Sequence, residues 1–250
     1  MEMRPFVRKN LSDTVKAELY DYIDNLDTEK GTKLPPENMI AQNYGVSRVT
    51  VRRALDELEQ EGVIIRIHGR GTFVNPQAKQ FKINLGVSQE LSRLVDRSGY
   101  EMRICLKAVE RIPADIIIGK ALEIPAGSMV ICVERAYYAD GHLAIVCQDF
   151  IAEDLFTEPP VREDWEQNSS YDVVRTKAGK LVNRDWIQLK TVLPSEMKSI
   201  SKIEAEFECN SLLEFYGLTY GQDNQPIIYG RTYYHTDYIR FNLARNIVAI

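Results

Sequence analysis

One internal repeat constrains the fold of this 250-residue chain more than any other feature of its sequence. When the chain is aligned with itself at an offset of 83 residues, the matched pairs are Ile124 with Phe207, Ser128 with Ser211, Val130 with Leu213, Asp140 with Asp223, and Ile145 with Ile228. In each copy the pattern predicts a helix followed by a two-stranded hairpin, the first at 129–151 and the second at 212–234.

Two copies of such a unit are too few and too long for a solenoid. They favour one antiparallel sheet whose halves are related by a pseudo-twofold axis, with helices packed around it. This arrangement leaves room for a ligand cleft between the halves. A further strand is expected at 104–111, after a helix at about 88–98.

Length and composition indicate a globular protein of two domains. The chain is longer than one average hydrophobic core supports. Its 44% hydrophobic and 27% charged residues exclude collagen-like and disordered chains. There is no apolar run of about 18 residues and no secretory signal, so we expect a cytoplasmic protein without a membrane span. The four cysteines lack metal-ligand spacing, so we expect reduced thiols, no metal and no cofactor.

The N-terminal segment has the pattern of three helices followed by a hairpin. The helices are expected at about 11–26, 36–44 and 48–61, and the strands at 63–67 and 72–74. Ser12 or Asp13 can cap the first helix, and Ser47 can cap the third by accepting a hydrogen bond from the Thr50 N–H. Gly45 provides the tight turn between the second and third helices.

The third predicted helix separates an apolar stripe from a basic face. The stripe consists of Val51, Ala54, Leu55 and Leu58. Arg48, Val49 and Arg52 therefore project from another face, where an Arg can bind guanine O6 and N7 in the major groove of DNA. The acidic side chains at 56–61 would point away from the DNA. The turn at 68–71 would form a basic wing tip, with Arg70 on it and Arg66 behind it.

The net charge of −5 does not exclude a nucleic-acid partner, because a binding surface depends on where the charges lie. Residues 1–80 carry 12 basic and 12 acidic side chains. The whole deficit of five therefore lies in residues 81–250.

Three separated motifs carry a family resemblance: Leu34-Pro35-Pro36-Glu37, Val46-Ser47-Arg48-Val49-Thr50-Val51-Arg52-Arg53-Ala54-Leu55, and Gly69-Arg70-Gly71-Thr72-Phe73-Val74. They resemble the winged helix-turn-helix of GntR-type bacterial transcription regulators over residues 9–75. Asn38 stands where the family often has an Arg that contacts DNA. The resemblance implies a DNA-contact set of Pro36, Glu37, Asn38, Ser47, Arg48, Val49, Thr50, Arg52, Arg66, His68, Gly69, Arg70 and Gly71.

The order of winged helix, linker and repeat resembles the HutC branch of this family, whose second domain is a UTRA domain with a chorismate-lyase-like fold. The matching residues are Glu134-Arg135, Asp140-Gly141, Asp223-Asn224-Gln225-Pro226, Arg231, Tyr234, Tyr238, Arg240 and Phe241. The resemblance implies an α+β protein with a winged helix-turn-helix at 1–75, a linker at 76–80 and an effector-binding and dimerisation domain at 81–250. The implied partners are operator DNA, a small-molecule effector and a second copy of the chain.

The effector site is expected between the two hairpins. Relatives that sense sugar phosphates tend to carry an acid on each return strand, and here these positions hold Cys147 and Ile228, which favours a less hydroxylated ligand. Arg135 and Arg231 suit a carboxylate or phosphate, although each is equally consistent with a salt-bridged strand residue. Tyr137 and Tyr234 fit either the wall of the cleft or the core of the sheet.

We interpret the chain as a ligand-responsive, homodimeric transcription regulator that is expected to act as a repressor, and not as an enzyme. The alternative is a chorismate-lyase-like enzyme domain fused to a DNA-binding head, because fold does not settle function. The sequence shows no nucleophile-base pair that would favour it. A third interpretation, a winged helix used for protein contacts alone, would require the face with Arg48 and Arg52 to be covered.

Overall fold

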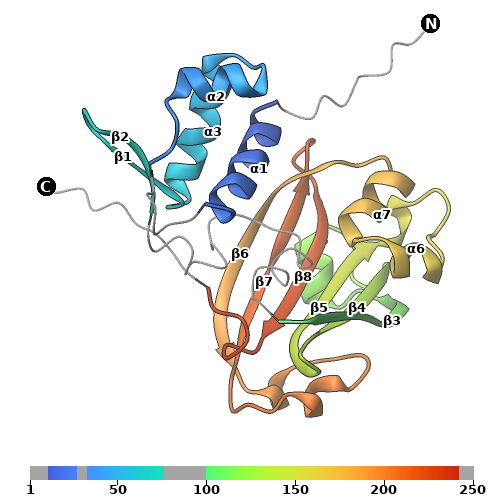
Figure 1. Ribbon diagram of the computed structural model, residues 1–250. Helices are drawn as coiled ribbons and strands as arrows, with labels where there is room; N and C mark the ends of the chain where they lie inside the picture. The colour runs from blue at the N-terminus through green and yellow to red at the C-terminus, as the bar shows by residue number, and fades with distance from the viewer. Residues whose placement is uncertain (1–10, 27–32, 76–99, 242–250) are drawn as a thin grey trace, which may run out of the picture. The chain divides into compact units, whose positions relative to one another are not determined.

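The computed structural model describes residues 11–26, 33–75 and 100–241 (Figure 1). Contacts divide these residues into two compact units, one that contains residues 11–75 and one that contains residues 100–240. The predicted linker at 76–80 and the predicted helix at 88–98 lie outside the described residues.

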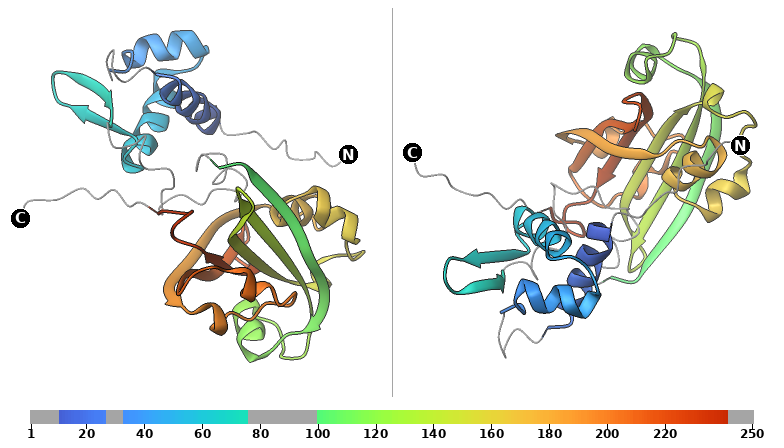
Figure 2. Two further views of the ribbon diagram at one scale, coloured as in Figure 1. Left: turned by 60° about the horizontal axis from the view of Figure 1, so that its bottom comes forward. Right: turned by 90° about the horizontal axis from the view of Figure 1, so that it is seen from above.

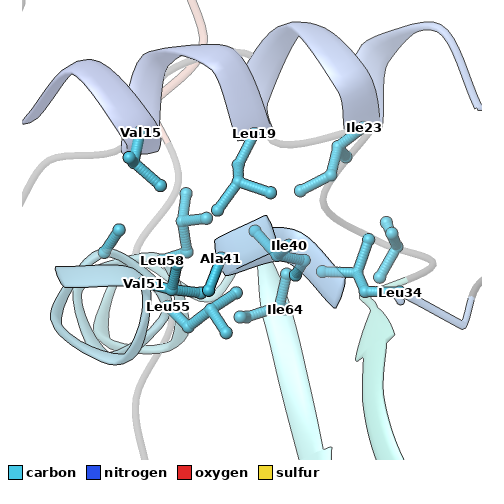
Figure 3. Packing of buried hydrophobic residues seen from close by; sticks show 12 residues of the cluster. Val15, Leu19, Ile23, Leu34, Ile40, Ala41, Val51, Leu55, Leu58 and Ile64 are labelled. Carbon is cyan, nitrogen blue, oxygen red and sulfur yellow. The ribbon is translucent and has the colours of Figure 1, made fainter. Parts of the chain in front are cut away.

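The first unit consists of three helices and a two-stranded wing. Its elements are α1 (Leu11–Asp24), α2 (Glu37–Tyr44), α3 (Arg48–Gln60), β1 (Ile64–Ile67) and β2 (Gly71–Val74). Side chains from every element meet in one apolar core (Figure 3), which includes Val15, Leu19, Ile23, Leu34, Ile40, Val51, Leu55, Leu58, Ile64 and Val74. The apolar stripe predicted on the third helix faces this core.

Local sequence features fix the helix ends. The Ser47 Oγ accepts a hydrogen bond from the Thr50 N–H at 3.1 Å, which confirms the predicted cap of α3. Gly45 ends α2 with φ of 63°, a conformation that side chains disfavour and glycine allows. The predicted cap at Ser12 or Asp13 is wrong, because both residues already lie within α1. Both residues lie inside its first turn, where Ser12 is buried.

The wing is an antiparallel hairpin whose base is tied to the core of the first unit. Ile64 pairs with Val74 at this base, and both side chains are buried. The Leu34 N–H donates to the Thr72 carbonyl at 2.9 Å, so the chain that leads into α2 runs along the free edge of β2. The sequence pattern did not predict this third segment.

The second unit is a six-stranded antiparallel sheet in the order β3-β4-β5-β8-β7-β6 (Figures 1 and 2). Its strands are β3 (Met102–Pro113), β4 (Met129–Ala139), β5 (His142–Ala152), β6 (Val182–Val192), β7 (Leu212–Gly221) and β8 (Pro226–Tyr234). Its helices are α5 (Ile116–Leu122), α6 (Arg162–Gln167) and α7 (Ser170–Lys177), with the 3-10 helices η1 (Glu153–Leu155), η2 (Pro194–Glu196) and η3 (Ile203–Glu206). Both predicted hairpins are present, whereas β6, α6 and α7 were not predicted.

The two copies of the repeat form the two halves of the sheet. Gln148 lies opposite Arg231 on the central strands β5 and β8. Because these residues are also 83 positions apart, the pseudo-twofold axis passes between them. Helix α5 precedes the first hairpin, but residues 193–211, all of them described, contain two 3-10 helices and no α-helix. The α-helix predicted before the second hairpin is therefore wrong.

Successive side chains of a strand point to opposite faces of the sheet. On one face, called the helix face below, Val133 and Ile151 share a core with Trp165 and other side chains of α6 and α7. On the other, the loop face, α5 and residues 193–207 cover the sheet.

Among the residues that the structure describes, no helix is both long and apolar enough to cross a membrane.

Candidate DNA interface and effector site

Helix α3 presents a basic face at its N-terminal end. Packing of the apolar stripe into the core turns Arg48, Val49 and Arg52 outward, and Val49 is 79% exposed. The Thr50 hydroxyl lies 2.8 Å from the Ser47 hydroxyl, beside this face. The structure thus exposes these side chains at the start of α3, as the sequence predicts.

The wing tip is exposed and basic. His68, Gly69, Arg70 and Gly71 are all exposed, and Gly69 has φ of 73°. Within the described ranges, neither Arg48 nor Arg70 forms an ion pair, so both charges are available to a phosphate or a base edge.

Arg66 differs from the other predicted DNA contacts because it is surrounded by acidic side chains. Its Nη1 pairs with Asp56 and lies 3.1 Å from the Glu59 Oε2. Its Nη2 lies 4.0 Å from the Glu37 Oε1. Partial burial lowers the pKa of Arg66, but the hydrogen bond and charge of Asp56 and the charges of Glu59 and Glu37 outweigh it, so the pKa is raised overall.

The residues at the start of α2 also divide into exposed side chains and a side chain that is paired within the protein. Pro36 and Asn38 are exposed, as a DNA contact requires. The Glu37 carboxylate instead accepts a hydrogen bond from the Arg52 Nη2 at 3.2 Å. Glu37 therefore contacts protein side chains on the surface that would face DNA.

The acidic side chains of residues 56–61 have partners within the first unit, chiefly Arg66 and Lys16. Asp56 and Glu59 pair with Arg66. Glu57 lies 3.3 Å from the Lys16 Nζ on α1, and Glu61 also pairs with Lys16. The sequence predicts only that these acids point away from DNA, and their partners could not be read from it.

The sheet register brings some of the predicted effector residues together. Arg135 lies opposite Cys147, which lies opposite Thr232, so one row crosses the helix face. Tyr137 and Tyr234 both lie opposite Ile145, in the next row of that face.

Arg135 is buried and links the helix face to α6 and α7. Its Nη1 donates to the Ser170 Oγ at 2.9 Å, and its Nη2 donates to the carbonyl oxygens of Trp165 and Asn168, each at 3.0 Å. The Asp149 Oδ2 lies 3.7 Å from the Arg135 Nη1 and accepts a hydrogen bond from Ser170. The guanidinium thus has neutral hydrogen-bond partners and a more distant carboxylate.

Arg231 does not join this cluster. It lies on the loop face, where its Nε donates to the Glu214 Oε1 at 2.8 Å. The reason is a β-bulge between Tyr137 and Tyr138, which shifts the pairing of β4 with β5 by one residue. Without the bulge Arg135 would lie opposite Val146 and share a face with Arg231. The two arginines predicted to act together are therefore on opposite faces.

Ile228 lies further from Arg135 than the sequence suggests. It pairs with Ile151 and is 1% exposed, within the apolar core beneath α6 and α7. Burial above all, and next the charge of Asp149, raise the pKa of the Cys147 thiol well above its usual value.

Sequence reasoning missed two polar members of this cluster, Asp149 and Ser170. Asp149 is two residues from Cys147 on the same face, so an acid is present although the return-strand position itself lacks one. Ser169 caps α7 by accepting from the Asp172 N–H at 3.1 Å, and this Ser-x-x-Asp pattern could have located the helix. Nothing in the sequence indicates that Ser170 meets Arg135.

A separate surface hollow lies at the β4–β5 turn, lined by side chains that include Tyr138, His142, Glu206, Glu208 and His235. Its acids already have partners: Glu206 accepts from the Tyr138 hydroxyl at 2.8 Å, and Glu208 lies 3.4 Å from the His142 Nδ1. None of the predicted effector residues lines it.

A winged helix-turn-helix with an exposed basic face, followed in the same chain by a six-stranded antiparallel domain, defines the class of DNA-binding transcription regulators. The sequence profile "Bacterial regulatory proteins, gntR family" matches residues 11–74, and that of the UTRA domain matches residues 97–240. The chain belongs to the gntR family of bacterial regulators and carries a UTRA domain.

Its relatives are named as regulators. The mannosyl-D-glycerate transport/metabolism system repressor MngR of Escherichia coli (strain K12) is 26% identical over 220 residues, which cover 87% of this chain and 88% of MngR. The probable fructoselysine utilization operon transcriptional repressor of the same strain is 33% identical over 134 residues, 51% of each chain. The crystal structure of the possible regulator YydK from Bacillus subtilis, at 18% identity, has a TM-score of 0.68 and covers 94% of this chain and 99% of YydK. That likeness shows the fold.

Proposed function

We propose that this regulator is a homodimeric repressor whose affinity for operator DNA changes when a small anionic molecule binds the helix face of its UTRA domain. The observation that carries the DNA-binding part is the exposure of Arg48 and Arg70, which form no ion pair within the described ranges. The names of two relatives support repression rather than activation.

The proposed effector site centres on Arg135. Its hydrogen bonds go to one hydroxyl and two carbonyl oxygens, and the Asp149 carboxylate stands 3.7 Å away. A buried guanidinium in these surroundings favours an incoming carboxylate or phosphate, which it can bind through two parallel hydrogen bonds. Asp149 offers an acceptor beside it, so the ligand that fits carries both an anionic group and a hydroxyl or ammonium donor.

We expect a homodimer because of the way in which winged helix-turn-helix domains read DNA. Two recognition helices reach one face of the duplex when their half-sites lie about one helical turn apart, and a twofold dimer matches a near-palindromic operator. We assign dimerisation mainly to the second domain, because the first presents its exposed surface to DNA.

The test starts with the full chain. We expect it to sediment as a dimer at micromolar concentration and to select a near-palindromic sequence from a pool of random duplexes. A chain that selects no sequence contradicts the DNA-binding proposal.

The effector is then sought with a panel of small metabolites that carry carboxylate or phosphate groups. Ligands that bind the folded state raise the melting temperature by mass action, and each such ligand is retested for its effect on operator affinity. If every member of the panel leaves both the melting temperature and the operator affinity unchanged, the effector proposal is contradicted. The DNA-binding proposal is not affected by that result.

A further inference from the structure

The two arginines of the wing have opposite surroundings, although they are four residues apart. Arg70 is exposed at the tip and has no acidic partner among the described residues. Arg66 lies on β1, its side chain is 29% exposed, and it faces Asp56 and Glu59 of α3. Both family resemblance and charge suggest DNA contacts for the pair, but only Arg70 is placed for one.

The contacts of Arg66 join the wing to the recognition helix at several points. Besides its ion pairs, the Arg66 backbone N–H donates to the Glu59 Oε1 at 3.2 Å. Its Nη2 lies 3.5 Å from the carbonyl oxygen of Arg52. Main chain and side chain of one wing residue are thus both fixed to α3.

Glu37 extends this network to α2. Its Oε2 accepts from Arg52 at 3.2 Å, and its Oε1 lies 4.0 Å from Arg66. One carboxylate therefore stands between an arginine proposed to read bases and the arginine that holds the wing. Three carboxylates around the Arg66 guanidinium also make its surroundings unfavourable for a DNA phosphate, which carries the same sign of charge.

Between its base and its turn, the wing is attached to α3 through the contacts of Arg66. Ile64 and Val74 anchor the base in the core. Arg66 lies opposite Thr72, between that base and the exposed turn. An ion-pair network at this position along the hairpin restricts how far the hairpin can tilt away from α3.

We propose that Arg66 is a positioning residue, which fixes the wing against the recognition helix through Asp56, Glu59 and Glu37 so that Arg70 and Arg48 reach one DNA site together. This proposal rests on the proposed DNA-binding function. Glu37 acts in the same network by holding Arg52, and it does not itself contact DNA.

The first experiment needs no DNA. Hydrogen exchange of the backbone amides of residues 64–74 is compared in the full-length protein, Arg66→Gln and Arg70→Gln. We expect roughly fivefold to tenfold faster exchange in Arg66→Gln, as loss of a network of this kind predicts, and no change in Arg70→Gln. Exchange in α1 provides the internal control for global stability. Unchanged exchange in Arg66→Gln overturns the proposal, whether or not the chain binds an operator.

The second experiment uses the selected operator and an unrelated duplex of the same length. A positioning role predicts that Arg66→Gln weakens operator binding by roughly fivefold to tenfold while the salt dependence of binding stays as in the wild type. Arg70→Gln is the matched control, and its salt slope should fall by about one unit. An equal fall in Arg66→Gln would mean that Arg66 binds phosphate directly.

The charge-swapped variant Asp56→Arg with Arg66→Asp separates these roles further. It restores one ion pair between α3 and β1 with the charges exchanged, but the new acid at position 66 stays beside Glu59 and Glu37. We therefore expect operator affinity and wing protection above those of Arg66→Asp alone and below those of the wild type. A direct phosphate contact predicts instead that the swap binds DNA no better than Arg66→Asp alone.

Discussion

Gln148 and Arg231 lie opposite each other at the pseudo-twofold axis, and each donates a hydrogen bond to a buried glutamate of its own hairpin. Gln148 donates to the Glu134 Oε2 and Arg231 to the Glu214 Oε1, both at 2.8 Å. The two copies of the repeat therefore share a hydrogen-bonding role at this position but differ in charge. The Arg231 charge is paired within the protein, because Glu214 lies 2.8 Å from it, and Lys190 shares the same buried carboxylate at 3.2 Å.

The sequence analysis places both Arg135 and Arg231 at the effector site, but their surroundings predict different effects of substitution. Arg231→Gln should lower the free energy of unfolding by roughly 2–3 kcal/mol, since it leaves Glu214 buried with one fewer cation. Binding of an identified anionic effector should persist in the folded variant. Thermal unfolding and calorimetry measure the two effects.

Arg135→Gln should instead abolish or strongly weaken effector binding, because it removes the guanidinium from the helix face. Operator affinity without effector should stay within about twofold of the wild type, since the variant leaves the head unchanged. If Arg135→Gln folds and binds effector with the original dissociation constant, the proposed site on the helix face is incorrect.

Arg48→Ala and Arg52→Ala should each weaken operator binding, because both side chains lie on the exposed face of α3. A lost bidentate guanine contact costs roughly 1–3 kcal/mol and relaxes specificity at one operator position. Arg53→Ala is the control on the same helix, where Arg53 lies 3.5 Å from Glu57. Fluorescence anisotropy gives the affinities, and circular dichroism checks folding. Wild-type affinity in both variants would exclude this face as the reading surface.

Arg70→Ala should weaken binding to operator and unrelated DNA alike, because a wing-tip phosphate contact is independent of sequence. The slope of log affinity against log salt should fall by about one unit. Affinities between about 50 and 200 mM salt measure it. A constant slope would place Arg70 away from the DNA.

Ile228→Glu should destabilise the second domain rather than only repel an anionic ligand. Ile228 is 1% exposed in an apolar core, where an unpaired carboxylate costs several kcal/mol. Ile228→Val is the control, expected to lose about 1 kcal/mol. A fully folded Ile228→Glu variant with an unchanged melting temperature would show that the carboxylate reaches water.

The elements recovered from the sequence are those with local causes. The stripe of α3 follows from spacing, the start of α3 follows from Ser47, and the two halves of the sheet follow from the 83-residue repeat. The exposed basic face of α3 was predictable for the same reason, because Arg48 and Arg52 are placed by the helix that carries them.

The side-chain cluster of the proposed effector site was predictable only in part, because it depends on the register between strands. Arg135, Cys147 and Tyr234 do share a face, but a single bulge moves Arg135 away from Arg231. Ser170 reaches the same site from a helix that no periodic pattern indicated. The role of Arg66 was hidden for a related reason: its acidic partners are visible in the sequence, but which cation each one pairs with depends on tertiary structure.

The pairing of β5 with β8 makes each copy of the repeat incomplete on its own. A chain holding the first copy alone would expose the free edge of β5, an 11-residue strand rich in apolar side chains. Such an edge pairs with a second chain, which would rebuild the sheet about a true twofold axis. In the fused chain this association is intramolecular, so assembly of the sheet does not depend on protein concentration. Fusion also lets the two central positions diverge, as Gln148 and Arg231 have done, which identical subunits could not.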